Sequence, residues 1–174
     1  MNPRPAAIEE LKALLLQTPR WTLAVAESLT AGRLQARVGE VSGASGFFLG
    51  GITAYSLEQK VKHLGVARVA AERVNSVSAE VAEQMAGGVC RLFGADLGVA
   101  TTGYAEPAPA EGVMQPFAWW AIARSRGGTG GAFSVRHGRL ECPGASRIET
   151  QRLVAEAVLA ELLAGLRAWR ATPA

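Results

Sequence analysis

One serine and one lysine stand where a hydrolase could use them. Ser28 follows a short, mostly apolar run at residues 21–26 and precedes residues 33–38, which have the pattern of a helix. At such a strand-to-helix turn, unpaired backbone N–H groups favour developing negative charge, so a hydroxyl there could attack a carbonyl. A second interpretation stays open, in which Ser28 or Thr30 only caps the helix, because capping is the commonest role of these residue types.

A nucleophilic serine needs a base, and the chain offers few. The two histidines are His63, at the end of a short predicted helix, and His137, which lies near arginines in a predicted strand. Both positions are typical of solvated groups. A lysine can serve instead if desolvation lowers its pKa until the amine is neutral near the working pH. Lys60 is our candidate among three lysines, although a solvated lysine is the commoner arrangement.

Strands and helices alternate along the first part of the chain and would position these groups. Apolar runs predict strands at residues 21–26, 47–55 and 96–102, and helical patterns occupy residues 5–18, 33–38, 57–64 and 81–92. Two further strands, 117–123 and 132–135, are joined by a Gly-rich turn at 126–131, which predicts an antiparallel hairpin. A capping box of Ser146 and Glu149 begins the last helix, with an apolar stripe behind it.

This order of elements predicts an α/β fold, specifically a three-layer α/β/α sandwich with a mixed, mostly parallel sheet of about five strands. In such sheets, ligands bind at the carboxyl ends of the parallel strands. Three of these ends carry polar residues, at positions 27–30, 55–60 and 101–103. We therefore expect Ser28 and Lys60 at the same edge of the sheet.

Composition narrows the class of protein. The chain has 174 residues, of which 49% are hydrophobic, and this suffices for one domain over residues 1–174. Cys90 and Cys142 lie far apart and match no metal-ligand spacing, so neither a disulfide framework nor a structural zinc is expected.

Charge and hydropathy exclude other classes. The formal net charge of +3 comes from scattered arginines rather than from a basic run with interleaved aromatics, so nucleic acid is not an expected partner. Charged residues interrupt the N-terminal leucines, which is unlike a signal peptide, and no apolar run approaches the length of a membrane span. We expect a cytoplasmic protein with no membrane partner.

The motifs at these positions resemble those of the CinA C-terminal domain family, the nicotinamide-nucleotide amidohydrolases. Residues 26–32 stand in the place of the family's A-E-S-C-T-G-G, and residues 43–48 and 50–56 look like its G-A-S-x-x-F and G-x-x-x-Y-S. Glu58 and Lys60 have the spacing of its N-E-x-K. Residues 77–78, 93–103 and 143–147 continue the similarity in order, so that it covers about residues 10–165.

The resemblance implies a mixed five-stranded α/β/α fold and amide hydrolysis without metal or cofactor, releasing ammonia from nicotinamide mononucleotide. It implies that Ser28 is the nucleophile, that Lys60 is its base and that Tyr55 assists them. The positions that would bind substrate, including the backbone that would stabilise the oxyanion, are Thr30, Ala31, Gly32, Thr102, Gly103 and Arg147. The implied partner is a small-molecule substrate, and a homo-oligomer stays open.

The chain departs from the family pattern mainly in one loop. Where the family has a glycine-rich stretch, residues 104–112 contain Pro107 and Pro109, which lack N–H donors for a phosphate, and Glu106 and Glu111, which would repel one unless Arg147 offsets them. Either the substrate differs, for example by lacking a phosphate, or the loop folds away from the site. An alternative function follows, a catalytically silent domain that binds a nucleotide or a partner through this loop.

Overall fold

The computed structural model describes residues 4–126 and 132–171 of the chain. Their strands form one mixed sheet with the order β2-β1-β3-β4-β5. The strands are β1 (Leu23–Glu27), β2 (Phe48–Thr53), β3 (Leu97–Tyr104), β4 (Phe117–Ser125) and β5 (Phe133–Glu141). β1 is parallel to both β2 and β3, whereas β4 is antiparallel to β3 and β5. The predicted mixed sheet and its antiparallel hairpin are confirmed.

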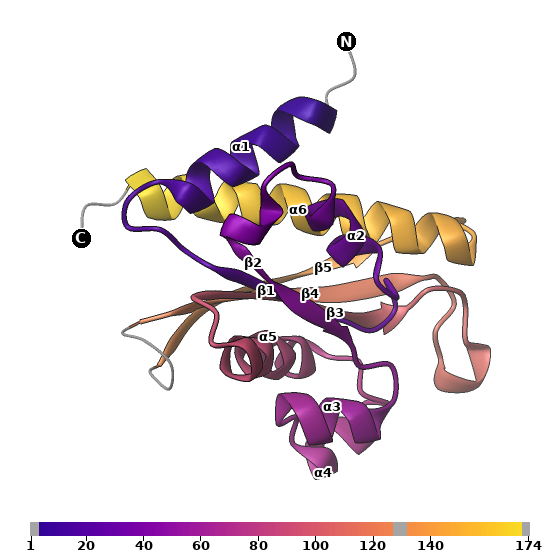
Figure 1. Cartoon of the computed structure of the whole chain (residues 1–174). Helices are drawn as coiled ribbons and strands as arrows, with labels where there is room; N and C mark the ends of the chain where they lie inside the picture. Colours follow the sequence, from indigo (N-terminus) through magenta and orange to yellow (C-terminus); the bar gives the residue numbers. More distant parts are fainter. Residues whose placement is uncertain (1–3, 127–131, 172–174) are drawn as a thin grey trace.

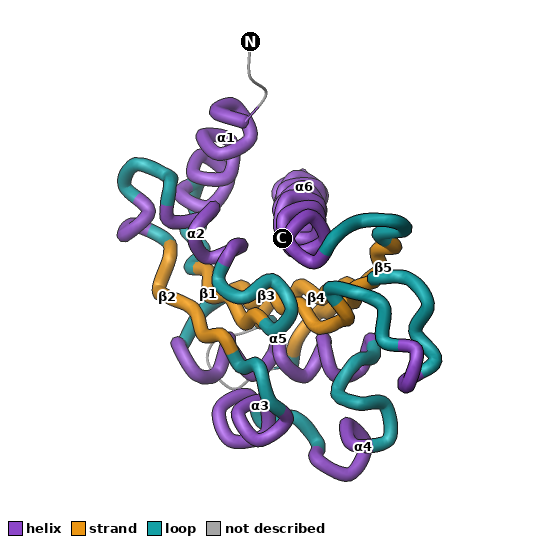
Figure 2. Tube along the Cα trace, turned by 90° about the vertical axis from the view of Figure 1, so that its right-hand side faces the viewer, coloured by secondary structure: helices purple, strands orange, loops and turns teal. Residues whose placement is uncertain are grey.

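Helices cover both faces of this sheet (Figure 1). One face carries α1 (Arg4–Leu16), α2 (Arg33–Gly39) and α6 (Arg147–Ala171), and the other carries α3 (Leu57–Leu64), α4 (Arg68–Glu72) and α5 (Ala79–Phe93). Short 3₁₀ helices lie at Ala44–Gly46 and Pro109–Glu111. Figure 2 shows α6 above the sheet and α5 below it. The predicted three-layer α/β/α sandwich is confirmed.

The interior strand β1 is buried along its whole length, and its two faces pack into two separate core clusters. Leu23 and Val25 belong to the cluster under α1, α2 and α6, while Ala24 and Ala26 face α5. Successive side chains of a strand point to opposite faces, so the larger residues pack toward the first cluster and the small ones toward α5. The small residues allow α5 to lie close against the sheet.

Local capping signals set the helix boundaries. The Ser78 hydroxyl accepts the Val81 N–H at 3.1 Å and begins α5, which ends at Gly94 in a left-handed conformation. At the start of α6 the predicted capping box is present, since the Ser146 N–H donates to the Glu149 carboxylate at 2.9 Å. These boundaries agree with the sequence pattern.

Two features differ from the sequence-based expectation. β5 continues to Glu141, well beyond the predicted 132–135, and α4 was not expected. β5 is an edge strand whose odd positions from 135 to 141 are exposed and mostly polar, so it lacks the apolar run of a central strand. Most of the predicted turn, residues 127–131, lies outside the described residues.

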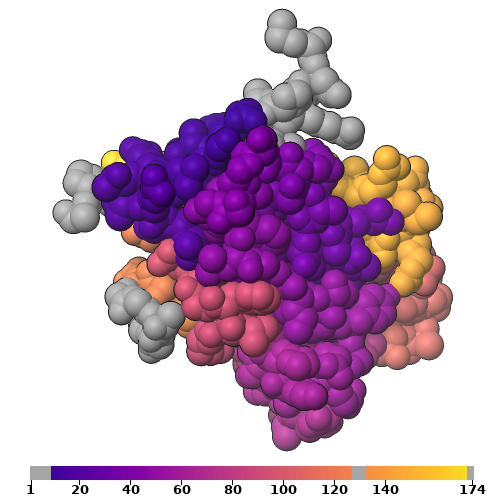
Figure 3. Space-filling model, in the orientation of Figure 1, coloured from indigo at the N-terminus to yellow at the C-terminus, as the bar shows by residue number. Residues whose placement is uncertain are grey.

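The carboxyl ends of β1, β2 and β3 lie at one edge of the sheet, and α3 begins just beyond β2. The α3–α4 segment forms a projection at the bottom of the molecule (Figure 3). Gly88 of α5 brings α3 close, because a Cβ at this position would lie 2.1 Å from the Leu64 carbonyl oxygen. α3 is thereby packed closely against α5, just beyond the carboxyl end of β2.

Candidate active site

Ser28 follows β1 directly and is 6% exposed. Its N–H donates to the Thr101 carbonyl at 3.0 Å, which fixes the backbone at the sheet edge. The N-cap of α2 is Gly32, and neither Ser28 nor Thr30 supplies a side-chain cap there. The interpretation in which these residues cap the helix is therefore wrong, and the Ser28 hydroxyl is not engaged in capping.

The cap comes instead from Glu27, a residue that the sequence analysis did not single out. Its fully buried carboxylate accepts the N–H groups of Gly32, Leu34 and Gln35 at 3.1, 3.0 and 2.8 Å. An acidic residue at a helix N-terminus is favoured by the helix dipole. Glu27 thus holds the turn after Ser28 in place.

The turn itself is tightly specified. Thr30 is fully buried, with its hydroxyl 2.7 Å from that of Thr101. Ala31 and Gly32 adopt left-handed backbone conformations with φ of 51° and 92°, and such a conformation costs a non-glycine residue about 1 kcal/mol. The N–H groups of Ala31 and Gly32 donate to Ser28 and Glu27, whereas those of Leu29 and Thr30 have no partner within the described part of the chain.

Lys60 lies in the first half of α3 and is 4% exposed. Burial lowers the pKa of its amine to about 8. No hydrogen bond or ion pair joins this amine to any residue that the structure describes. The expectation of a solvated lysine is wrong, and the lowered pKa increases the fraction of neutral amine, the form that can accept a proton.

A cavity of about 240 Å³ brings the two groups together. Six of the predicted site residues line it: Ser28, Tyr55, Lys60, Thr102, Gly103 and Arg147. Thr30, Ala31 and Gly32 are not among the residues that line it. Within the described residues the Ser28 hydroxyl and the Lys60 amine are not hydrogen-bonded to each other, and catalytic hydrogen bonds are often longer in structures without substrate.

The walls of the cavity include residues that the sequence analysis did not identify. Asn75 has a left-handed backbone before α5 and donates from its side-chain amide to the Tyr104 hydroxyl at 3.0 Å. The Thr102 hydroxyl donates to the Ser76 carbonyl at 2.7 Å, so it supports the wall. Left-handed Asn is a backbone feature that no pattern in this sequence indicates.

An arginine and two partners form the mouth of the cavity. Arg147, the first residue of α6, donates to the Tyr55 hydroxyl and to the Glu106 carboxylate, both at 2.6 Å. The interaction with Tyr55, and then that with Glu106, holds the pKa of Arg147 above its usual value. Residues 105–108 also line the cavity, so the expectation that the divergent loop folds away from the site is wrong.

The histidines and cysteines lie elsewhere. Neither His63 nor His137 lines the cavity, and His137 pairs with Glu83 at 2.5 Å. Cys90 and Cys142 are buried free thiols, and burial raises the pKa of Cys90 to about 12. Residues 4–126 and 132–171 contain no group of three or more His, Cys, Asp or Glu side chains that could hold a metal ion.

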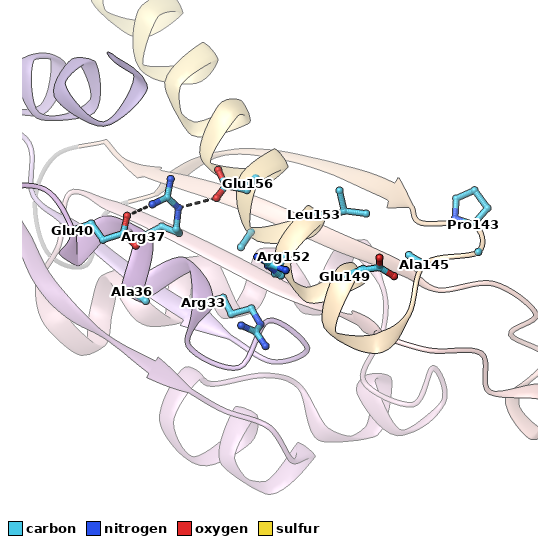
Figure 4. A pocket seen from close by; sticks show the side chains of 12 residues that line it. Arg33, Ala36, Arg37, Glu40, Pro143, Ala145, Glu149, Arg152, Leu153 and Glu156 are labelled. Atoms are coloured by element: carbon cyan, nitrogen blue, oxygen red, sulfur yellow. Dashed lines mark hydrogen bonds and ion pairs between the residues drawn. The ribbon is translucent and has the colours of Figure 1, made fainter. Parts of the chain in front are cut away.

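A larger groove of about 800 Å³ lies between α2 and α6 (Figure 4). Arg37 is paired there with Glu40 and Glu156, and Arg33 donates to the Gln151 amide at 3.1 Å. None of the predicted site residues lines this groove, whereas six of them, including Ser28 and Lys60, line the smaller cavity. The smaller cavity is therefore the candidate active site.

Comparison with known proteins agrees with this fold. Residues 6–166 match the model of the CinA C-terminal domain, and the chain belongs to this family. It is 36% identical over 154 residues to a CinA-like protein of Chlorobium limicola, and 45% identical over 100 residues to a CinA-like protein of Chlorobaculum tepidum. These alignments cover 88% and 58% of this chain but only 35% and 24% of the two relatives, which are much longer proteins.

A solved structure shows the same architecture. A competence-damaged protein (CinA) superfamily protein of Klebsiella pneumoniae superimposes with a TM-score of 0.84 at 25% identity, covering 97% of this chain and all of that one.

Among the described residues of this chain, no helix is both long enough and apolar enough to cross a membrane.

Proposed function

We propose that this chain is an amidohydrolase that deamidates nicotinamide mononucleotide or a related small amide, with Ser28 as nucleophile and Lys60 as base. The observation that carries the proposal is the buried Lys60 amine, whose pKa is lowered to about 8, on the same cavity as the Ser28 hydroxyl. Burying an amine without a partner destabilises the folded chain. A lysine that acts as a base needs such an environment, because desolvation favours its neutral form.

The proposed reaction proceeds through an acyl-enzyme. The neutral Lys60 amine takes the hydroxyl proton as the Ser28 Oγ attacks the amide carbon, and the C–N bond then breaks as Lys60 returns the proton to the leaving ammonia. Water, deprotonated by the same amine, hydrolyses the ester. The N–H groups of Leu29 and Thr30 have no partner among the described residues, so we assign the oxyanion to them rather than to Ala31 or Gly32.

The other predicted site residues take supporting roles in this proposal. Tyr55 is held by Arg147 at the mouth, where it would orient the substrate. Gly103 supports the wall, because a Cβ there would lie 2.3 Å from the Phe117 carbonyl oxygen. Thr102 acts through its hydrogen bond to Ser76.

Hydrolysis is tested by measuring ammonia release from nicotinamide mononucleotide and from its dephosphorylated nucleoside. Lys60→Ala is expected to lower kcat/KM by about 10² to 10⁴, the usual contribution of a general base, and Ser28→Ala by at least as much. Lys62→Ala removes an exposed lysine from the same helix and is the matched control. Undiminished activity in both Ser28→Ala and Lys60→Ala would contradict the mechanism.

The pH profile gives a second readout of the same proposal. Because a protonated amine cannot accept the serine proton, kcat/KM is expected to rise with pH and to level off above about 8, the pKa of Lys60. A flat profile from about pH 6 to about pH 9, roughly two units below and one unit above the Lys60 pKa of about 8, would remove Lys60 from the role of base.

A catalytically silent binding domain is the second candidate. The altered loop at residues 104–112 favours it, as does the lack of a direct hydrogen bond between Ser28 and Lys60 within the described residues. It predicts that ligands bind without ammonia release, and that Ser28→Ala leaves their affinity unchanged. Calorimetric titration beside the ammonia assay separates the two functions.

A further inference from the structure

The mouth of the candidate active site contains its own anion. The cations that line the cavity among the described residues are Lys60 and Arg147, and the acidic residue that lines it is Glu106. The Glu106 carboxylate lies 2.6 Å from Nη1 of Arg147, while Nη2 donates to Tyr55. Both ends of the guanidinium fork, which could otherwise bind a phosphate in a bidentate manner, are therefore occupied.

In the loop beside Arg147, few backbone N–H groups are available to bind a phosphate instead of the guanidinium. Pro107 and Pro109 have no N–H, and the N–H groups of Ala108 and Val113 donate across a small bridge to each other's carbonyls at 2.8 and 3.1 Å. Those of residues 111 and 112 donate within the same turn, to carbonyls at 2.9 and 3.0 Å. A loop that binds phosphate directs backbone N–H groups toward the anion, and this loop uses four of them internally.

The size of the cavity also favours a ligand without a phosphate group. The volume of about 240 Å³ lies below the range of about 300 to 1,000 Å³ that is usual for sites of drug-sized ligands. A single amide-bearing ring fits this space better than a ligand that also places a sugar phosphate inside it.

We propose that this site takes a small amide without a phosphate group, neutral or cationic, and that Glu106 determines this specificity by occupying Arg147. A phosphate dianion would have to displace the carboxylate and then remain near it, and like charges at that distance repel. The proposal rests on the amidohydrolase function and specifies its substrate class.

The test compares two substrates that differ only by the phosphate, nicotinamide mononucleotide and nicotinamide riboside. The wild-type chain is expected to have the higher kcat/KM for the riboside. Glu106→Gln keeps the size of the side chain and removes its charge, so it is expected to shift the ratio toward the mononucleotide by about tenfold. Glu111→Gln is the matched control, because it removes the same charge from an exposed position of the same loop that does not line the cavity.

Each outcome decides the proposal. A wild-type preference for the mononucleotide overturns it, as does an equal shift in Glu106→Gln and Glu111→Gln, which would indicate bulk charge rather than a site. If no amide is hydrolysed, the amidohydrolase function fails. The specificity is then decided by calorimetry, from the ratio of the affinities for the riboside and the mononucleotide in wild type and in Glu106→Gln. Lack of binding by both compounds overturns the specificity as well.

Discussion

Lys60 lies in surroundings that disfavour its own charge. Its side chain is 4% exposed, and burial lowers its pKa from the ordinary 10.5 to about 8. Between these two values the unfolded chain binds more protons than the folded chain at this residue. The charged Lys60 therefore lowers the free energy of unfolding. This loss of stability is fully present below pH 8 and is removed as the pH rises from 8 toward 10.5.

Lys60→Met is therefore expected to stabilise the protein while abolishing the proposed activity. At pH 7 we expect the free energy of unfolding to rise by about 2 kcal/mol, because methionine fills a similar volume without a charge to desolvate. Urea denaturation at pH 7 and pH 10 measures the free energy of unfolding, and the gain in stability of Lys60→Met over wild type should be smaller at the higher pH. Lys62→Met, at an exposed position of the same helix, is the control, and an equal gain there would contradict a specific effect of burial.

Two glycines set how closely the helices on one face of the sheet approach the site. A Cβ at Gly98 of β3 would lie 2.1 Å from the Ala86 carbonyl oxygen, so α5 packs directly on the sheet. A Cβ at Gly88 would meet the backbone of α3 at Leu64. The position of Lys60 thus depends on contacts between backbones, with no intervening side chain to yield.

Gly88→Ala is expected to displace α3 and with it the Lys60 amine. We expect a loss of about 1 to 3 kcal/mol in the free energy of unfolding, despite the better helix propensity of alanine, together with reduced ammonia release. Gly87→Ala is the matched control, since its Cβ would lie 3.4 Å from the nearest side-chain atoms and no backbone is close. If both variants are as stable as wild type, the close approach of α3 is not a constraint.

Across the whole molecule, α6 connects the mouth of the site to the N-terminal layer. It begins at Arg147 and ends near Arg170, which donates to the carbonyls of Leu14, Gln17 and Pro19 at 2.8 to 3.1 Å. The Arg170 guanidinium also lies 3.5 Å from the centre of the Trp21 ring. These contacts join α6 to the segment that leads from α1 into β1.

Arg170→Met is expected to lower the free energy of unfolding by about 2 kcal/mol, because charged hydrogen bonds and a cation–π contact are lost together. The kcat/KM for ammonia release should not change, since Arg170 does not line the cavity. Arg167→Met, which removes an exposed ion pair with Glu10, is the control and should cost less than about 1 kcal/mol. Thermal unfolding of wild type, Arg167→Met and Arg170→Met checks this order of decreasing stability.

Features that depend on near neighbours could be predicted from the order of the residues alone. The capping box at Ser146 predicted where the last helix begins, and the alternation of apolar runs with helical patterns predicted the layers, because these signals act within a few residues. The same alternation placed Ser28 and Lys60 at one edge of the sheet. It did not predict the extent of β5, since an edge strand with one solvated face needs no continuous apolar run.

The burial and pairing of the groups at that edge depend on contacts between distant parts of the chain. The sequence left Lys60 as a solvated side chain in its commonest interpretation, and the packing of α3 on α5 buried it. Glu27 took the capping role that one interpretation gave to Ser28 or Thr30, and Glu106 reached Arg147 across 41 positions of the chain. Burial and pairing depend on which distant residues meet, and this is settled by packing of the whole fold rather than by local pattern.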